Sequence, residues 1–237
     1  MVTSRIWGCE RACARSHPQI RGPGMIIGET GEDKLNQTGF WWILLAWALY
    51  GVLHSLLASI SAKTLAERLL GPGVRRYYRL FFNLVVSVTL LPLFGLVVLS
   101  PDLEISRISF PWLALTLLIQ GLAALGLLAG LLQTGAMHFL GLAQITAPRP
   151  SGAQHKLVVN GLYRYVRHPL YLFGLLILWL LPLMTWNILA FNLGATVYIL
   201  VGIRFEERKL LKEFGQAYAD YRRRVPMLLP WTKNHRR

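Results

Sequence analysis

Charged side chains and cysteines are scarce in this sequence. Only 15% of its 237 residues are Asp, Glu, Lys or Arg, against about a quarter in an ordinary soluble domain. Two cysteines, Cys9 and Cys13, exclude a disulfide-rich scaffold, and one CxxxC spacing does not predict a metal site. Hydrophobic residues make up 54% of the chain, which excludes a disordered protein. The composition therefore favours a chain that lies in an apolar environment rather than one dissolved in water.

Acidic residues are scarcer than basic ones. The sequence has 11 Asp and Glu against 25 Lys and Arg, which gives a formal net charge of +14. Such an excess suits a nucleic acid, the anionic face of a membrane or an acidic substrate. Long uncharged stretches decide among the three, because about 20 consecutive apolar residues form a helix that crosses a bilayer.

Uncharged apolar stretches recur along the chain. The longest, 169–203, exceeds one span and is interrupted by the turn-like LPLMT, so it predicts a hairpin of two helices. The spans predicted in this way lie at about 40–60, 80–99, 111–133, 169–182 and 185–203. The sequence thus predicts an all-α fold, a polytopic membrane helix bundle with five transmembrane helices, in a single domain over 39–237.

Lys and Arg are distributed unevenly between the connecting segments. The loops 61–79 and 134–168 and the C-terminal tail are rich in them, whereas 100–110 holds only Arg107. Because cytoplasmic loops carry the excess of basic residues, the C-terminus is expected in the cytoplasm, with a bacterial inner membrane as the location. The charge is explained by this topology, so membrane lipids are expected as partners and nucleic acid is not.

The two ends of the chain differ from the spans. Residues 1–38 have no apolar core of signal-peptide length and predict a disordered tail. In RFEERKLLKEFGQAYADYRRR, apolar residues recur at helical spacing with charges between them. This segment predicts an amphipathic helix at about 204–224 on the cytoplasmic surface.

The stretch GLYRYVRHPLYLFG, residues 161–174, places basic residues at the start of the fourth span. Pro169 is suited to the first turn of a helix, so the helix is expected to begin there. Its free N–H groups then lie beside Arg164, Arg167 and His168, which is an anion-binding arrangement. The alternative is that these residues are positive-inside anchors and that the neighbouring tyrosines form an interfacial belt.

Two adjacent carboxylates, Glu206 and Glu207, follow the fifth span. Carboxylates that leave a membrane helix are costly unless they are solvated, paired or bound to a cation. Pairing within the helix, with Arg204 and Lys209, is one explanation. The other is that the hairpin brings a cationic and an anionic cluster to one cytoplasmic mouth, which suits a zwitterionic ligand.

Polar residues within the spans are few. His54 is a functional candidate because ionisable groups in a membrane are costly, but a hydrogen bond from its neutral imidazole to a neighbouring helix explains it equally well. Asn83, Gln120 and Asn192 are expected to join helices, and the pair Gly126 and Gly130 to allow close packing.

The stretches GLYRYVRHPLYLFG and EERKLLKEFGQAYADYRRRVPMLLP together resemble the signature of the membrane-integral S-adenosylmethionine-dependent methyltransferases. This superfamily includes isoprenylcysteine carboxyl methyltransferase, phospholipid N-methyltransferases and methanethiol S-methyltransferase. The resemblance covers Leu157 to Trp231. Within the superfamily, the stretches that resemble the methanethiol-methylating branch most are His54-Ser55, His138-Phe139-Leu140-Gly141 and the LPLMT turn with YILVGIRFEERKL.

The resemblance implies S-adenosylmethionine as the methyl donor. Arg167, His168 and the helix start would take its carboxylate, and Glu206 or Glu207 its ammonium. The implied binding residues are Tyr163, Arg164, Arg167, His168, Pro169, Tyr171, Gly174, Glu206 and Glu207. Glu207 and His138 are the candidate catalytic residues, as bases toward a thiol.

The activity implied is methyl transfer to a small thiol or to another small apolar or lipid-like acceptor. Two further possibilities stay open within the same superfamily. One is methylation of an isoprenylcysteine-like carboxylate or a phospholipid amine. The other is a non-catalytic membrane protein linked to nitrogen-oxide metabolism.

Overall fold

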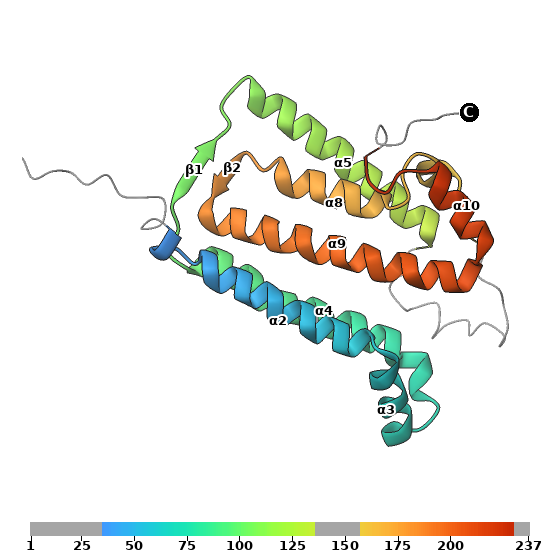
Figure 1. The fold of residues 1–237 in the computed structure, drawn as a ribbon. Helices are drawn as coiled ribbons and strands as arrows, with labels where there is room; N and C mark the ends of the chain where they lie inside the picture. Colours follow the sequence, from blue (N-terminus) through green and yellow to red (C-terminus); the bar gives the residue numbers. More distant parts are fainter. Residues whose placement is uncertain (1–34, 136–156, 230–237) are drawn as a thin grey trace, which may run out of the picture.

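The computed structural model describes residues 35–135 and 157–229, and within them the chain is mostly helical (Figure 1). The helices are α2 (Phe40–Ala58), α3 (Ile60–Leu70), α4 (Val74–Leu99), α5 (Trp112–Thr134), the 3₁₀ turn η1 (Gly161–Arg164), α8 (Pro169–Trp179), α9 (Trp186–Phe214) and α10 (Gln216–Arg224). Two short strands, β1 (Glu104–Arg107) and β2 (Leu183–Thr185), pair antiparallel.

Four of the helices, α2, α4, α5 and α9, are long and apolar enough to cross a membrane. The prediction of a helical membrane protein is therefore confirmed with four candidate spans. Helix α8 is apolar but has 11 residues, or about 16 Å, which is shorter than the hydrocarbon core of about 30 Å.

The chain continues from α8 as strand β2, which pairs with β1 in the connection between α4 and α5. This pairing lies at the end of the bundle opposite to α10 (Figure 1). The mostly helical chain thus also contains one short two-stranded pairing, in which backbone groups of the two connections satisfy each other at the end of the bundle.

The structure adds detail to two predicted segments. The loop 61–79 contains α3, which begins after Ser59, whose hydroxyl accepts a hydrogen bond from the backbone N–H of Ala62 at 3.1 Å. Within the stretch predicted as a tail, 1–38, Leu35 packs against the core. The hydroxyl of Thr38 also donates a hydrogen bond to the Leu35 carbonyl at 2.9 Å.

Helix α9 has 29 residues and is about 44 Å long, so it extends beyond a hydrocarbon core and carries Glu206 and Glu207 past it. The helix predicted at 204–224 is in fact the end of α9 followed by α10. Gly215 separates them at φ +54, a backbone conformation that favours glycine.

Small and polar residues hold the helices together. The Gln120 side chain donates to the Ile177 carbonyl and that of Asn192 to the Leu178 carbonyl, each at 2.9 Å, so both join their helices to α8 as predicted. A Cβ at Gly126 would lie 2.5 Å from the Phe173 ring, which confirms close packing of α5 on α8.

Helix α2 packs along α9, and Gly194 sets their separation. A Cβ at Gly194 would lie 2.2 Å from Cδ1 of Trp47, a buried ring of the core. We therefore expect Gly194→Ala to destabilise the protein by about 1–3 kcal/mol, because the ring must shift. Thermal unfolding in detergent measures this effect.

The matched control is Gly202→Ala on the same helix, where an added Cβ meets no atom within 4 Å. Alanine is the better helix former, so we expect this variant to unfold at the wild-type temperature or above it. Equal unfolding temperatures for the two variants would show that the contact between Trp47 and Gly194 does not limit packing.

Candidate functional site

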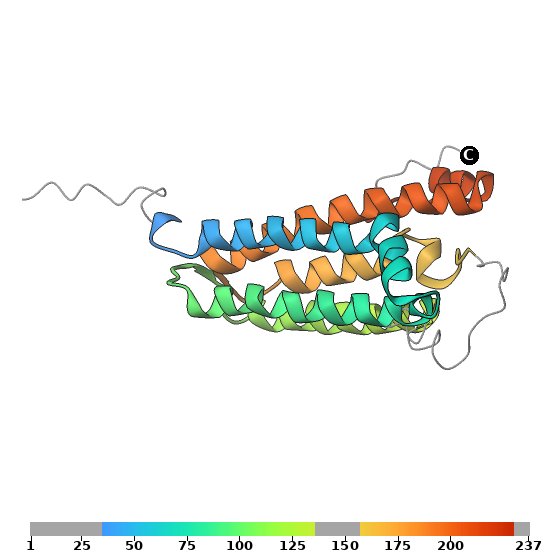
Figure 2. The ribbon, with the colours of Figure 1, turned by 90° about the horizontal axis from the view of Figure 1, so that it is seen from below.

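The start of α8, the end of α9 and helix α10 meet at one end of the bundle (Figure 1). Helix α8 lies between α5 and α9 (Figure 2). The stretch 161–174 and the carboxylates of α9 are thereby brought together, as the sequence predicts.

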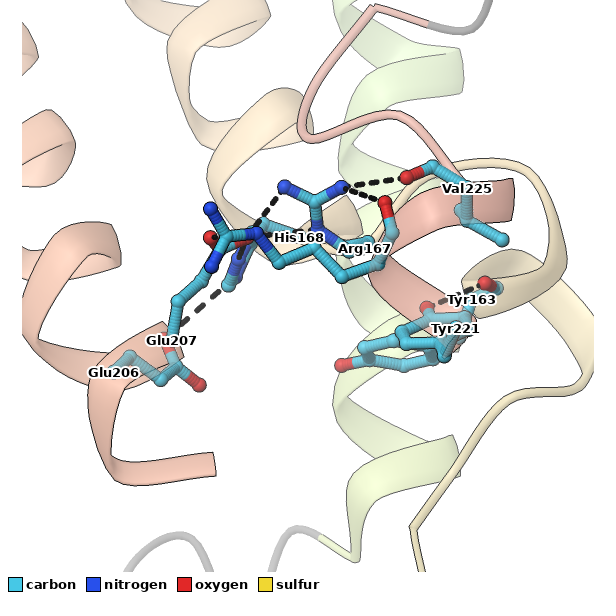
Figure 3. A network of polar contacts seen from close by, with 8 residues as sticks. Tyr163, Arg167, His168, Glu206, Glu207, Tyr221 and Val225 are labelled. Atoms are coloured by element: carbon cyan, nitrogen blue, oxygen red, sulfur yellow. Dashed lines mark hydrogen bonds and ion pairs between the residues drawn. The ribbon is translucent and has the colours of Figure 1, made fainter. Parts of the chain in front are cut away.

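A buried ion pair between Arg167 and Glu207 lies at the centre of this end (Figure 3). Nε and Nη2 of Arg167 are 2.7 and 2.6 Å from Oε1 of Glu207, and the two residues are 8% and 6% exposed. Nη1 donates to the carbonyls of Arg222 and Val225, at 3.0 and 2.6 Å. Arg167 therefore ties the start of α8 to α9 and to the end of α10.

Backbone hydrogen bonds also join the start of α8 to the segment that follows α10. The N–H of Arg167 donates to the Pro226 carbonyl at 2.9 Å, and that of His168 to the Met227 carbonyl at 3.2 Å. The segment after α10 is thus fixed against the residues that begin α8.

His168 lies between the two carboxylates. Its Nε2 is 3.4 Å from Oε1 of Glu207, its Nδ1 is 3.7 Å from Oε2 of Glu206, and it is 5% exposed. Burial lowers the pKa of His168 below its ordinary value, and the carboxylate charges oppose this only in part. The ring is therefore neutral at pH 7 and packs against Tyr171, with ring centroids 5.6 Å apart.

Glu206 differs from its neighbour in exposure, since 44% of its side chain is accessible. The Tyr171 hydroxyl interacts with its carboxylate. Burial, with the charge of Glu206 in second place, raises the pKa of Tyr163 to about 12. Tyr163 therefore stays protonated, and Glu206 is an accessible carboxylate that interacts with the neutral side chains of His168, Tyr163 and Tyr171.

Two tyrosines of α10 complete the cluster. The Tyr221 hydroxyl donates to the Tyr163 carbonyl at 2.6 Å and holds η1 against α10 (Figure 3). The Tyr218 hydroxyl is buried and has no hydrogen-bond partner among the described residues. Burial, assisted by the charge of Glu207, raises the pKa of Tyr218 to about 12. Tyr218 therefore has an unused O–H donor beside the ion pair.

A hollow of about 550 Å³ lies between the end of α9 and α10. Its lining residues are Arg167, Leu211, Ala219, Arg222 and Arg223. Nε of Arg222 is 3.5 Å from Oε2 of Glu207. The hollow is lined by three guanidinium groups, of which that of Arg167 is paired with Glu207 and that of Arg223 with Asp220.

Comparison with known proteins points to the same part of the chain. Residues 118–217 match the family described as phospholipid methyltransferase. Methanethiol S-methyltransferase 1 of Bradyrhizobium diazoefficiens is 32% identical over 209 residues, which are 87% of this chain and 72% of that protein. This chain belongs to the membrane methyltransferase superfamily. With its four candidate spans, it is an integral membrane protein.

Other members of the superfamily match over shorter segments. Methanethiol S-methyltransferase of Mycobacterium tuberculosis is 54% identical over 74 residues, 31% of this chain and 30% of that protein. Protein-S-isoprenylcysteine O-methyltransferase of Tribolium castaneum is 32% identical over 90 residues, 35% of this chain and 31% of that protein. The match thus spans less than a third of these two relatives. No solved structure matches the chain.

Not all of the site residues predicted from the sequence of this methyltransferase-family chain belong to the cluster. Among the described residues, Glu206 and Glu207 form no ion pair with Arg204 or Lys209, so the explanation by pairing within the helix is wrong. Arg164 is exposed at the end of η1, outside the network in Figure 3. His138 lies outside the described residues.

Sequence reasoning missed the role of the segment after α10. The carbonyls of Val225, Pro226 and Met227 accept hydrogen bonds from Arg167 or from the backbone of His168. Backbone acceptors have no residue-type signal. The one available hint was that RRRVP stands within the family-like stretch.

Proposed function

We propose that the protein is a membrane methyltransferase that moves a methyl group from S-adenosylmethionine to a small thiol. The observation that carries this proposal is the difference between the two carboxylates: Glu207 is neutralised by Arg167, whereas Glu206 is 44% accessible at its side chain. The names of the relatives, methanethiol S-methyltransferase, support the thiol as acceptor.

The residues of the cluster fit the methyl donor. S-adenosylmethionine has an ammonium, for which Glu206 is the available carboxylate. Its carboxylate suits the start of α8, where the positive end of the helix dipole favours an anion. The buried Tyr218 hydroxyl offers one unused donor. A Cβ at Gly174 would meet no atom within 4 Å, so there is room for a ligand beside α8.

When bound, the donor supplies a methyl carbon made electrophilic by the sulfonium. The chain supplies positioning and a site that excludes water. In this proposal the helices around the site are fixed to one another by Arg167, His168 and Glu207. The donor is contacted by Glu206, Tyr163 and Tyr171. This revises the roles implied by the sequence, because the nitrogens of Arg167 are already bonded within the protein.

In the proposed topology five segments cross the membrane, and α8 together with β2 forms the fourth segment. We infer from the basic loops that the protein lies in a bacterial inner membrane and that the end with α3 and α10 faces the cytoplasm, where S-adenosylmethionine is available. Helix α10 and the end of α9 then lie on the cytoplasmic side.

Binding and transfer in detergent test the proposal. Calorimetry is expected to show S-adenosylmethionine binding to monodisperse protein, and labelled methyl groups are expected to reach ethanethiol rather than phosphatidylethanolamine or a farnesylcysteine analogue. Absence of binding would refute a methyltransferase. Transfer only to the lipid or only to the farnesylcysteine carboxylate would refute the thiol acceptor and favour the alternative that the other relatives suggest.

A further inference from the structure

Three aromatic rings surround His54 inside the bundle. Its ring centroid lies 6.4 Å from that of Tyr50 on α2, 5.0 Å from Phe82 on α4 and 5.4 Å from Tyr198 on α9. We refer to these four residues as the aromatic box. Three helices thus contribute to one apolar compartment around an imidazole.

His54 has no hydrogen-bond partner in the part of the chain that the structure describes, and its side chain is partly exposed. The explanation by a hydrogen bond to a neighbouring helix carbonyl is therefore wrong within these residues. An ionisable ring without a partner is costly in apolar surroundings. Its nitrogen is left available to a bound molecule.

The box leads toward the donor site along α9. The rings of Tyr50 and Tyr198 pack with their centroids 5.4 Å apart, and Tyr171 on the neighbouring α8 packs against His168. Tyr198 precedes Glu206 on α9 by about 12 Å, which is toward the membrane interior. The box therefore lies on the membrane side of the carboxylate that we assign to the donor's ammonium.

Space for a small molecule adjoins the box. An apolar cavity of about 220 Å³ lies between α2 and α4, and Tyr50 is part of its lining. Its other lining residues are Ala46, Leu49, Leu53, Thr89, Pro92, Leu93 and Leu96. None of them is charged, so the cavity suits an apolar molecule and not a headgroup or a carboxylate.

We propose that the aromatic box is the acceptor site, that it binds a small alkyl thiol, and that His54 is the catalytic base. The proposal rests on the proposed function and adds its acceptor chemistry. The rings exclude water and pack against the alkyl group, and their faces favour a sulfonium nearby. The imidazole accepts the S–H proton, which Glu207 cannot do while it is paired with Arg167.

The reaction is balanced with a sulfonium methyl donor as the co-reactant. The thiol proton moves to a ring nitrogen of His54, and the sulfur electron pair forms a bond to the methyl carbon. The bond between that carbon and the donor sulfur breaks, and its electron pair stays on the donor sulfur. The products are two thioethers and an imidazolium, which then releases its proton to water.

The His54→Asn variant tests the base with two thiols of different acidity. We expect kcat/KM for ethanethiol to fall about 100- to 10,000-fold, because general-base assistance is lost. For thiophenol, which is already ionised near neutral pH, we expect a loss of less than about tenfold. S-adenosylmethionine affinity is expected to stay within twofold of wild type, as in the neighbouring control Ser55→Ala.

Acceptor binding is tested without turnover. Calorimetric titration of ethanethiol into protein saturated with S-adenosylhomocysteine is expected to show about tenfold weaker binding for Phe82→Ala. The matched control is Phe94→Ala on the same helix, whose ring packs on Phe191, and there we expect wild-type affinity.

The outcomes separate the two proposals. Wild-type kcat/KM for ethanethiol in His54→Asn, equal losses with both thiols, or loss of donor binding would overturn the role of His54. Equal ethanethiol affinity in the two phenylalanine variants would overturn the box as acceptor site. Failure of the wild-type protein to bind the donor or to methylate any thiol would overturn the proposed function instead.

Discussion

Replacing Glu207 with alanine is expected to lower the free energy of unfolding by about 3–5 kcal/mol, because it leaves the buried guanidinium of Arg167 without its counter-charge. Nε and Nη2 of Arg167 both contact Oε1 of Glu207, at 2.7 and 2.6 Å. His168 and Arg222 also lie near this carboxylate, at 3.4 and 3.5 Å. Removing this carboxylate therefore weakens the contacts that join α8, α9 and α10.

Chemical denaturation in detergent micelles measures the change, and the adjacent residue provides the control. Glu206→Ala removes the same side chain from a half-exposed position, so we expect a loss below about 1 kcal/mol. The double variant Arg167→Met, Glu207→Leu is expected to recover part of the loss, since no buried charge remains. Recovery stays incomplete because the Arg222 and Val225 carbonyls lose their donor. Equal stability of the two single variants would contradict this account.

The sequence predicts the long helices well because a helix that crosses a bilayer requires a long apolar run. A span needs about 20 apolar residues, and α2, α4, α5 and α9 each contain such a run. Helix α3 is below that length and lies in a stretch that the sequence predicts as a loop. The uncharged run from 169 does predict a helix, and α8 begins at Pro169 as expected but ends at Trp179. The pairing of β1 with β2 joins Glu104 to Thr185, and no local pattern reports a partner so distant in the chain.

The motifs predict the cluster but not its internal contacts. Glu206 and Glu207 are adjacent, so on a helix their side chains point about 100° apart. Which one is buried depends on Arg167 and on the packing of α10, which are tertiary features. The aromatic box was equally hidden, because His54, Phe82 and Tyr198 come together only when three helices pack.

Replacing Glu206 with glutamine is expected to weaken S-adenosylmethionine binding about 10- to 150-fold while leaving stability unchanged. The amide keeps the size of the side chain and an acceptor for the Tyr171 hydroxyl, but it removes the charge that would meet an ammonium. A hydrogen bond to a charged group contributes about 1.5–3 kcal/mol, and each 1.4 kcal/mol is about tenfold in affinity.

Calorimetry of the purified variant checks this, with Glu213→Gln as the control. Glu213 is an exposed carboxylate on the same helix, so its removal changes the net charge equally without touching the cluster. Weakening of similar size in both variants would mean that general surface charge, not Glu206, attracts the donor. If only Glu206→Gln loses affinity and its unfolding midpoint is unchanged, Glu206 is the carboxylate that binds the donor. Glu207 then has the other role, because its removal lowers the stability of the fold.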